Sequence, residues 1–293
     1  MKFTVASTVL TALSTLLTGA SADVTALASG TGCTFATQFT NSLDTGFRVR
    51  LFHYPLWDWI HFNKEEWVAN SYTTKNAYGT AYSVTQPQLS YTYNLFAPAT
   101  TEIFGVPGVE FNHFVAEYMG YFKAKESGMY SFKINGLDDG AMIFFGTQTA
   151  FNACGPQVSV PDASWNEYLM WGKNPWDIDS ETSDIGYVFL EEGFYYPMRL
   201  VYINNGENAL FDFDITTPSN EVIVNFDGWV YNVEDIPTGV CELQGDLNQY
   251  NIAQTTTEIW TETYTTTGFS QVTGVADAKE TTWIREIVYV PNN

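Results

Sequence analysis

The sequence predicts an all-β protein built as an antiparallel β-sandwich. Polar and apolar residues alternate with a period of two in 47–52 (FRVRLF) and 128–134 (GMYSFKI), as they do along strands with one buried and one wet face. Aromatic residues make up 16% of the chain, and no segment keeps a helical period. Turn residues separate the alternating runs too closely for crossover helices, so we expect neighbouring strands to pair antiparallel.

The first 22 residues have the three parts of a secretory signal peptide. Lys2 precedes an apolar segment from Val5 to Leu17, and the small residues at 20–22 (ASA) form a cleavage site. The apolar segment falls short of the roughly 20 residues that a membrane span needs. No later stretch is long and apolar enough to cross a bilayer. We therefore expect secretion, cleavage after Ala22 and no membrane span.

The other expected strands follow in chain order, each bounded by clusters of Gly, Asn, Asp or Pro that favour turns. They are Tyr118–Ala124, Ala141–Phe145, Met198–Ile203, Leu210–Thr216 and Glu221–Val224. All of these strands fall within 23–243, which we interpret as a single head domain.

The composition changes near Gln244. We interpret 244–254 (QGDLNQYNIAQ) as a linker, and 255–293 as a Thr-rich segment with two β-like runs, 259–264 and 284–290. One isolated copy is too short to be identified as a repeat by internal similarity.

Charge and cysteine content narrow the classes of function. Twelve Lys and Arg against 33 Asp and Glu give a net charge of -21, which excludes nucleic acid as a partner and suits a solvated surface that attracts cations. Three cysteines in an oxidising compartment predict one disulfide and one free thiol among Cys33, Cys154 and Cys241. Spacing alone leaves the pairing open.

Asp138 and Asp139 are the most informative polar pair, because they lie between two expected strands. Asp-Asp-Gly is a common turn sequence, and a turn is the simpler interpretation. The alternative is a site for a hard cation such as Ca²⁺, which takes six to eight oxygen ligands. Adjacent side chains on an extended chain point to opposite sides, so both carboxylates reach one ion only if the backbone departs from that geometry.

Several segments together resemble the fungal lectin-like adhesins of the flocculin and GLEYA group, within the anthrax-protective-antigen domain superfamily. TTTEIWTETYTTT at 255–267 is similar to the opening of a flocculin stalk repeat, so 255–293 is expected to be the start of a Thr-rich β stalk. The resemblance covers nearly the whole chain after the leader. The segments that carry it in the head are 46–56 (GFRVRLFHYPL), 120–155, 193–218 (GFYYPMRLVYINNGENALFDFDITTP) and 226–241 (FDGWVYNVEDIPTGVC).

The resemblance implies a β-sandwich with long ligand-binding loops and a calcium-dependent sugar site. In the family, the aspartates that match Asp138 and Asp139 are joined by a cis peptide that turns both carboxylates toward the ion. The family's loop asparagine matches Asn204, which would give its side-chain oxygen. The remaining positions are two carbonyl donors, Gly206 and Asn208, and two residues that would face the sugar, Asn205 and Glu207.

Two departures from the family pattern limit what the resemblance implies. Flocculins have a tryptophan where this chain has Asn208, so mannose-type specificity is not implied. An aromatic platform for the sugar would come instead from Trp176, with Trp171 as the competing candidate, although each Trp is by default a packing residue.

The second departure is a single cysteine, Cys154, where flocculins have two in a row. By register it matches the cysteine that pairs with the C-terminal one. The resemblance therefore favours a Cys154–Cys241 disulfide with Cys33 free, and Cys33–Cys154 is the alternative.

These features predict an adhesin of the fungal cell wall, displayed in many copies and binding cell-surface glycans, for cell-cell or cell-substrate adhesion in flocculation or host attachment. The alternatives are a secreted glycoside hydrolase and a non-binding structural wall protein. We expect no enzyme, because the three histidines show no His-Glu-x-x-His spacing and no Gly-x-Ser-x-Gly elbow is present. Carboxylate pairs are too abundant to indicate a glycosidase.

Overall fold

In a computed structural model of the chain, the structure describes residues 32–40, 43–55, 65–92, 100–147, 149–154, 168–173, 185–232, 240–243, 252–260, 266–276 and 279–291. The expected signal peptide, most of the expected linker and Trp176 lie outside these residues. No helix in the described ranges is long and apolar enough to cross a membrane.

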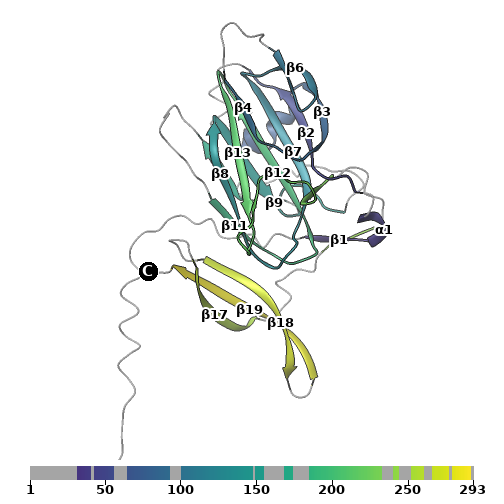
Figure 1. Cartoon of the computed structure of the whole chain (residues 1–293), viewed down its shortest axis with the longest axis vertical. Helices are drawn as coiled ribbons and strands as arrows, with labels where there is room; N and C mark the ends of the chain where they lie inside the picture. The colour runs from purple at the N-terminus through teal and green to yellow at the C-terminus, as the bar shows by residue number, and fades with distance from the viewer. Residues whose placement is uncertain are drawn as a thin grey trace, which may run out of the picture.

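Two antiparallel sheets form a sandwich (Figure 1). The nine-stranded main sheet has the order β10-β9-β12-β7-β2-β3, and β1, β15 and β16 join it off this path. Its strands are β1 (Cys33–Phe35), β2 (Phe47–His53), β3 (Ala77–Val84), β7 (Phe114–Lys123), β9 (Gly140–Phe145), β10 (Met170–Lys173), β12 (Tyr195–Asn204), β15 (Val230–Tyr231) and β16 (Cys241–Leu243).

The five-stranded second sheet has the order β11-β8-β13-β14, with β4 paired to β13. Its strands are β4 (Leu89–Tyr91), β8 (Gly128–Asp138), β11 (Ile185–Leu190), β13 (Ala209–Thr216) and β14 (Val222–Ile223). A separate hairpin pairs β5 (Thr100–Ile103) with β6 (Val106–Glu110). The described helical elements are short: α1 (Thr37–Thr40), α3 (Glu65–Ala69) and the 3-10 helix η1 (Ser71–Thr74).

The predicted all-β antiparallel fold is therefore confirmed, and each expected strand of the head corresponds to an observed one. Most are longer than the sequence pattern predicted. For example, β8 continues past Ile134 to Asp138, because its pairing with β13 continues beyond a bulge at Asp212/Phe213. The expected strand at 221–224 is shorter, since only Val222 and Ile223 pair with β13.

The space between the sheets is filled by aromatic side chains. Phe132 on the second sheet meets Phe145 on the main sheet edge to face, with ring centroids 4.9 Å apart. Phe211, Phe213 and Phe226 form a nearly parallel stack. Such rings bury large apolar areas, and their packing stabilises the contact between the two sheets.

The expectation of one wet face is correct for the second sheet and wrong for the main sheet. β8 and β13 alternate between buried and partly exposed positions, whereas every residue of β12 is buried. A second apolar cluster covers the outer face of the main sheet and includes residues of α3, of η1 and of the segment 150–154. The sequence pattern shows apolar alternation but not what packs on the other face.

The outer face of the main sheet also contains a buried ionic group. The Glu117 carboxylate is fully buried and accepts hydrogen bonds from Arg50 Nε at 2.7 Å and from the Tyr72 hydroxyl, while Arg50 Nη2 lies 2.6 Å away. Arg199 Nη1 donates to Tyr72 Oη at 3.2 Å and to the Ala69 carbonyl at 2.6 Å. These bonds fasten α3 and η1 to strands β2, β7 and β12.

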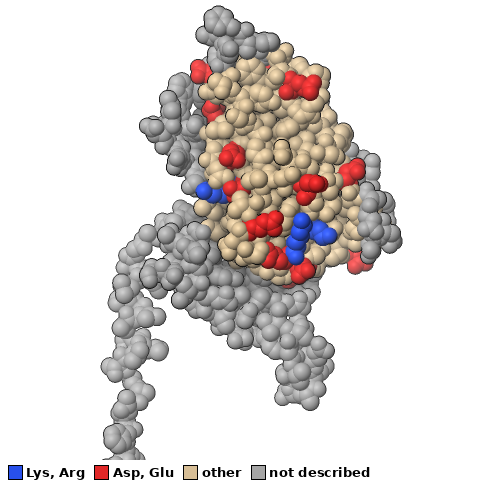
Figure 2. All heavy atoms as spheres, viewed as in Figure 1, with Lys and Arg blue, Asp and Glu red and all other residues tan. Residues whose placement is uncertain are grey.

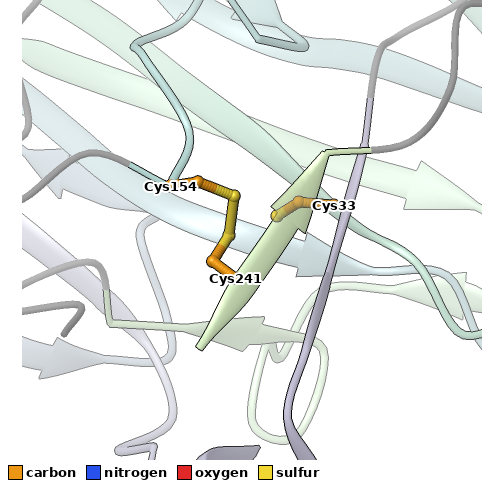
Figure 3. A group of neighbouring side chains, drawn as sticks. All are labelled: Cys33, Cys154 and Cys241. Atoms are coloured by element: carbon orange, nitrogen blue, oxygen red, sulfur yellow. A yellow bond between two sulfur atoms is a disulfide. The ribbon is translucent and has the colours of Figure 1, made fainter. Parts of the chain in front are cut away.

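The structure contains the disulfide that the family resemblance favoured, Cys154–Cys241, so the Cys33–Cys154 alternative is wrong (Figure 3). It ties the segment after β9 to β16, near the end of the expected head domain. Cys33 is a free thiol beside the bridge, and its burial raises its pKa to about 12. A thiol with so high a pKa stays protonated at neutral pH and is a poor nucleophile.

The Thr-rich segment forms its own three-stranded sheet. β17 (Ile252–Trp260) pairs in parallel with β19 (Lys279–Pro291), and β18 (Thr266–Ala276) pairs antiparallel with β19. The two β-like runs expected there overlap β17 and β19. Whether this sheet is one unit of a repeating stalk stays a prediction.

Acidic side chains are scattered over the face of the molecule drawn in Figure 2, with few basic ones among them. Dispersed carboxylates of this kind remain solvated. The carboxyls of Asp138 and Asp139 differ, because they lie together and are partly removed from water.

Candidate functional site

Two connections between the sheets meet at one end of the sandwich. The first runs from β8 to β9 through Asp138 and Asp139, and the second runs from β12 to β13 through residues 205–208. Leu210 pairs with Asp138 in the second sheet, and Ile203 pairs with Gly140 in the main sheet. The two loops lie side by side, because both of their ends adjoin paired strands. In the second sheet these are β8 and β13, and in the main sheet they are β9 and β12.

The backbone turns sharply at Asp139, but not by the mechanism that the resemblance implied. The described residues contain no cis peptide bond, so the expected cis link between Asp138 and Asp139 is wrong. Instead, Asp139 has a left-handed backbone with φ of 44°. Aspartate tolerates this region better than most residues, and the change of backbone region breaks the alternation that would otherwise separate the two carboxyls.

The Asp139 carboxylate connects the two loops directly. Its Oδ2 accepts the backbone N–H of Asn205 at 2.5 Å, and only 6% of the residue is exposed. Asp138 is half-buried beside it.

Asn204 is the last residue of β12 and is fully buried. Its Nδ2 donates to the carbonyl of Phe111 at 2.7 Å, which fixes the orientation of the amide. Its Oδ1 is directed toward the loop, where the Gly206 N–H approaches it at 3.4 Å. An amide held in this way presents its oxygen on the side where the second loop begins.

A buried tyrosine braces the two loops, and the sequence analysis did not identify it. The Tyr202 hydroxyl donates to the Asp138 carbonyl at 2.6 Å and accepts the Leu210 N–H at 3.1 Å. The only signal in the sequence was its place two residues before Asn204. The two partners of its hydroxyl lie 64 and 8 residues away in the sequence and are brought to it by strand pairing. The sequence pattern could therefore not predict these hydrogen bonds.

Electrostatics at the loops favour a bound cation. Burial raises the pKa of the Asp138 carboxyl, and burial together with the neighbouring Asp138 and Glu207 raises that of Asp139 to about 7. Backbone N–H groups of Asn205 and Gly206 offset part of this effect. A divalent ion would remove the cost of ionising both carboxyls in a partly desolvated site.

The donors present at the loops also suit Ca²⁺ chemically. Carboxylate, amide and carbonyl oxygens are the ligands that this ion prefers. The side-chain amide of Asn205 is fully buried, and neither its Oδ1 nor its Nδ2 has a hydrogen-bond partner in the structure as described. A buried amide without partners is costly, and this one belongs to the residue whose backbone N–H is bonded to the Asp139 carboxylate.

The other expected site residues differ in exposure. Gly206 is buried, whereas Glu207 and Asn208 are exposed at the tip of the second loop, with Glu207 in a left-handed conformation at φ of 59°. Asn205 was expected to face a sugar, but its side chain is buried. Trp171 is partly buried and packs edge to face on Tyr168.

Comparison with known proteins identifies relatives of this architecture. The GLEYA domain family matches residues 114–217, from the first residue of β7 to one residue beyond β13, and so includes both loops. Flocculation protein FLO9 of Saccharomyces cerevisiae is 27% identical over 269 residues, which cover 80% of this chain and 20% of that protein. The chain therefore spans about a fifth of the length of this relative.

Topoisomerase I damage affected protein 8 of Saccharomyces cerevisiae is 31% identical over 117 residues, which cover 40% of this chain and 91% of that protein. Among solved structures, the subtype-switched epithelial adhesin 9 to 1 A domain from Candida glabrata, in complex with beta-lactose, matches with a TM-score of 0.59 and 24% identity. The match covers 72% of this chain and 96% of that chain. It confirms the fold.

Proposed function

The chain belongs to the GLEYA and flocculin group of fungal lectin-like adhesins, and from this premise we propose that it binds carbohydrate at the cell surface through a calcium ion. The observation that carries the proposal is the meeting of Asp138, Asp139 and Asn204 at the junction of two loops that each cross between the sheets. The whole protein would act in adhesion between cells or between cell and substrate.

In this proposal, calcium is held by side-chain oxygens of Asp138, Asp139 and Asn204 and by the carbonyls of Gly206 and Asn208. The bound ion supplies coordination positions that sugar hydroxyls fill. The protein's own contribution is to hold the donors in place. Tyr202 joins the two loops, and the Phe111 carbonyl orients the Asn204 amide.

The exposed residues of the second loop, Glu207 and Asn208, are then placed to contact the sugar. Asn205 would contribute through its buried amide instead of a solvent-facing contact. Trp176 stays a proposed sugar platform. Since a shallow site gives weak binding, adhesion would depend on many copies displayed together.

The proposed organisation is a cleaved leader at 1–22, a head at 23–243, a linker at 244–254 and the start of a stalk at 255–293, at the outer cell wall. The relatives named for function are adhesins, and we propose that this chain likewise catalyses no reaction. A structural wall protein would keep the fold without binding sugar, and a glycosidase would hydrolyse it.

A glycan array probed with the purified protein tests the function. We expect binding to one class of terminal sugar in millimolar calcium and its reversible loss in excess chelator, because the ion forms part of the sugar site. Binding that persists in chelator would contradict the role of calcium. No binding to any glycan would favour the structural wall protein, and release of sugar from labelled oligosaccharides would favour the glycosidase.

Calcium affinity is expected to depend on pH with a definite sign. The pKa of Asp139 is about 7 in the metal-free protein, against an ordinary value of 3.8, so below pH 7 calcium must displace a proton from this carboxyl. The apparent association constant should fall by about tenfold per pH unit as pH drops from 7 to 5. Calorimetric calcium titrations at pH 8, 6 and 5 measure this slope, and a pH-independent affinity would contradict the binding of calcium by an Asp139 carboxyl with a raised pKa.

The same shift predicts the opposite trend for stability without calcium. Because the raised pKa makes folded Asp139 bind its proton more tightly than the unfolded chain does, the metal-free fold loses stability as pH rises from 4 through 7. Thermal melts in chelator at pH 5 and pH 8 check the sign. Added calcium should reverse the trend, since the ion binds the ionised form.

A further inference from the structure

The strand β16, near the end of the expected head domain, is joined to the sandwich by few non-covalent contacts. It spans three residues, and β1 is its only strand partner among the residues that the structure describes. Glu242 and Leu243 are exposed, and Cys33 of β1 lies opposite Leu243. A pull on the chain beyond Leu243 therefore breaks the pairs between β16 and β1 one after another, and each backbone hydrogen bond contributes only about 1 kcal/mol net.

The Cys154–Cys241 disulfide adds a covalent connection at the start of this strand (Figure 3). Cys241 is the first residue of β16, so peeling that begins at Leu243 stops at the bridge. The two cysteines are 87 residues apart, and the loop that they close contains β12, β13 and residues 205–208. Tension that reaches Cys241 passes through the sulfur atoms and does not extend this loop.

Cys154 belongs to a segment that is anchored on the main sheet. Ala150 and Phe151, just before it, are fully buried. Arg199 Nε donates to the Ala150 carbonyl at 2.9 Å, and the Phe151 ring packs edge to face on Tyr121 with centroids 5.1 Å apart. Since Arg199 lies on β12 and Tyr121 on β7, tension that reaches Cys154 is transmitted to two central strands of the main sheet.

Cys154 and the candidate site lie toward opposite ends of these strands. β9 begins at Gly140, next to Asp139, and the segment with Cys154 follows its other end. In Figure 1, β1 lies at the lower end of the sandwich, whereas β6, which leads into the site through Phe111, lies at the upper end. Tension between these ends runs along antiparallel strands, whose perpendicular hydrogen bonds share it. Because β12 and β7 pair at ten positions, this connection is stronger than that of β16 to β1.

We propose that the Cys154–Cys241 disulfide is a mechanical clamp, which transmits tension from the chain beyond β16 to the strands that hold the candidate site. The inference rests on the proposed function, in which a sugar holds the head at the two loops and the cell holds it through the chain beyond Leu243. Tension between these points crosses the bridge, and the second loop at 205–208 keeps its folded geometry. An adhesin under shear needs this property, because its donors hold an ion only while both loops stay side by side.

Cys33 allows the clamp to be moved instead of removed. The sulfur atoms of Cys33, Cys154 and Cys241 all lie within 4.8 Å of one another. When serine replaces Cys241, oxidised glutathione can therefore join Cys33 to Cys154, and it takes up the two electrons and two protons that the thiols lose. This variant keeps one disulfide on the buried segment, but β16 is then attached by hydrogen bonds alone.

Single-molecule force spectroscopy of the full chain tests the proposal without any sugar. One handle is attached through an azide-bearing amino acid in place of the exposed Glu102, in the β5–β6 hairpin, and the other follows Asn293. In the parent we expect no lengthening from residues 155–240 at any force. In Cys241→Ser, β16 should peel at a lower force than the first step of the head in the parent. The fully extended variant should be longer than the parent by roughly 300 Å, because 87 residues enter the tether.

Cys33→Ser is the matched control, because it removes a sulfur but keeps the bridge, and it should extend as the parent does. Dithiothreitol reduces the bridge of the folded, tethered parent to two thiols and is itself oxidised to a cyclic disulfide. It should reproduce the Cys241→Ser trace without any effect of the substitution on folding. Equal first-step forces in the parent and in the reduced parent would overturn the proposal. Steps from β17–β19 occur in every tether and do not affect the comparison.

Calcium titration without load separates this inference from the proposed function. Folded Cys241→Ser should bind calcium with the affinity of the parent, since the bridge lies at the far end of β9 from Asp139. Absence of calcium binding in both proteins would contradict the proposed function and leave the force measurements on the mechanical clamp unchanged.

Discussion

Replacement of Asp139 by asparagine is expected to reduce calcium affinity by about 100-fold or more and to remove calcium-dependent glycan binding. The Asp139 carboxyl is the most buried charged donor of the site and is hydrogen-bonded to the opposite loop. Removal of one partner from a buried charge pair costs about 3–5 kcal/mol, and each 1.4 kcal/mol is about tenfold in affinity. Calorimetry with calcium and a glycan array measure the two losses.

The stability of this variant distinguishes loss of a ligand from loss of the fold. Asparagine keeps an oxygen for the Asn205 N–H but carries no charge, so the metal-free variant should melt at or above the temperature of the metal-free parent at pH 8. Asp214→Asn, on the outward face of β13, is the matched control and should bind calcium normally. Equal effects of the two substitutions would mean that general acidity, not this site, attracts calcium.

The second large effect is expected at Glu117, where replacement by glutamine should destabilise the fold by about 3–5 kcal/mol. The carboxylate is fully buried and accepts hydrogen bonds from Arg50 and Tyr72. A neutral glutamine therefore leaves the Arg50 guanidinium without its anionic partner. For a domain of this size the melting temperature should fall by roughly 6–20 °C. Differential scanning calorimetry measures the change.

Glu102→Gln is the matched control, because Glu102 is exposed on β5. We expect its effect on unfolding free energy to stay within about 0.5 kcal/mol. Calcium affinity of the folded Glu117→Gln protein should be unchanged, since Glu117 lies on the outer face of the main sheet, away from the two loops. A small effect of Glu117→Gln on stability would show that the covering elements α3 and η1 are held by apolar contacts alone.

The limits of sequence reasoning are clearest at the two loops. Asp138, Asp139 and Asn204 were chosen by their resemblance to a family, and strand pairing then places their connections side by side. The expected cis peptide was wrong, and the chain instead turns through the left-handed backbone of Asp139. The role of Tyr202 was missed, since both of its partners are backbone groups and leave no trace in the side-chain pattern.

The sequence by itself determined where the main strands lie and which oxygen-bearing residues the two loops carry. Apolar alternation predicted β2 and β8, and runs bounded by turn residues predicted β7, β9, β12 and β13, because both patterns are local properties of the chain. The residue types of the two loops are also read directly from the sequence. Their oxygen donors are those that a hard cation such as calcium prefers. Only the tertiary structure decided which polar atoms are buried together, because burial depends on what packs against each face. It enclosed Glu117 beneath α3 and η1, and it brought His53 at the end of β2 and His113 in the turn before β7 to the carboxylate of Glu110.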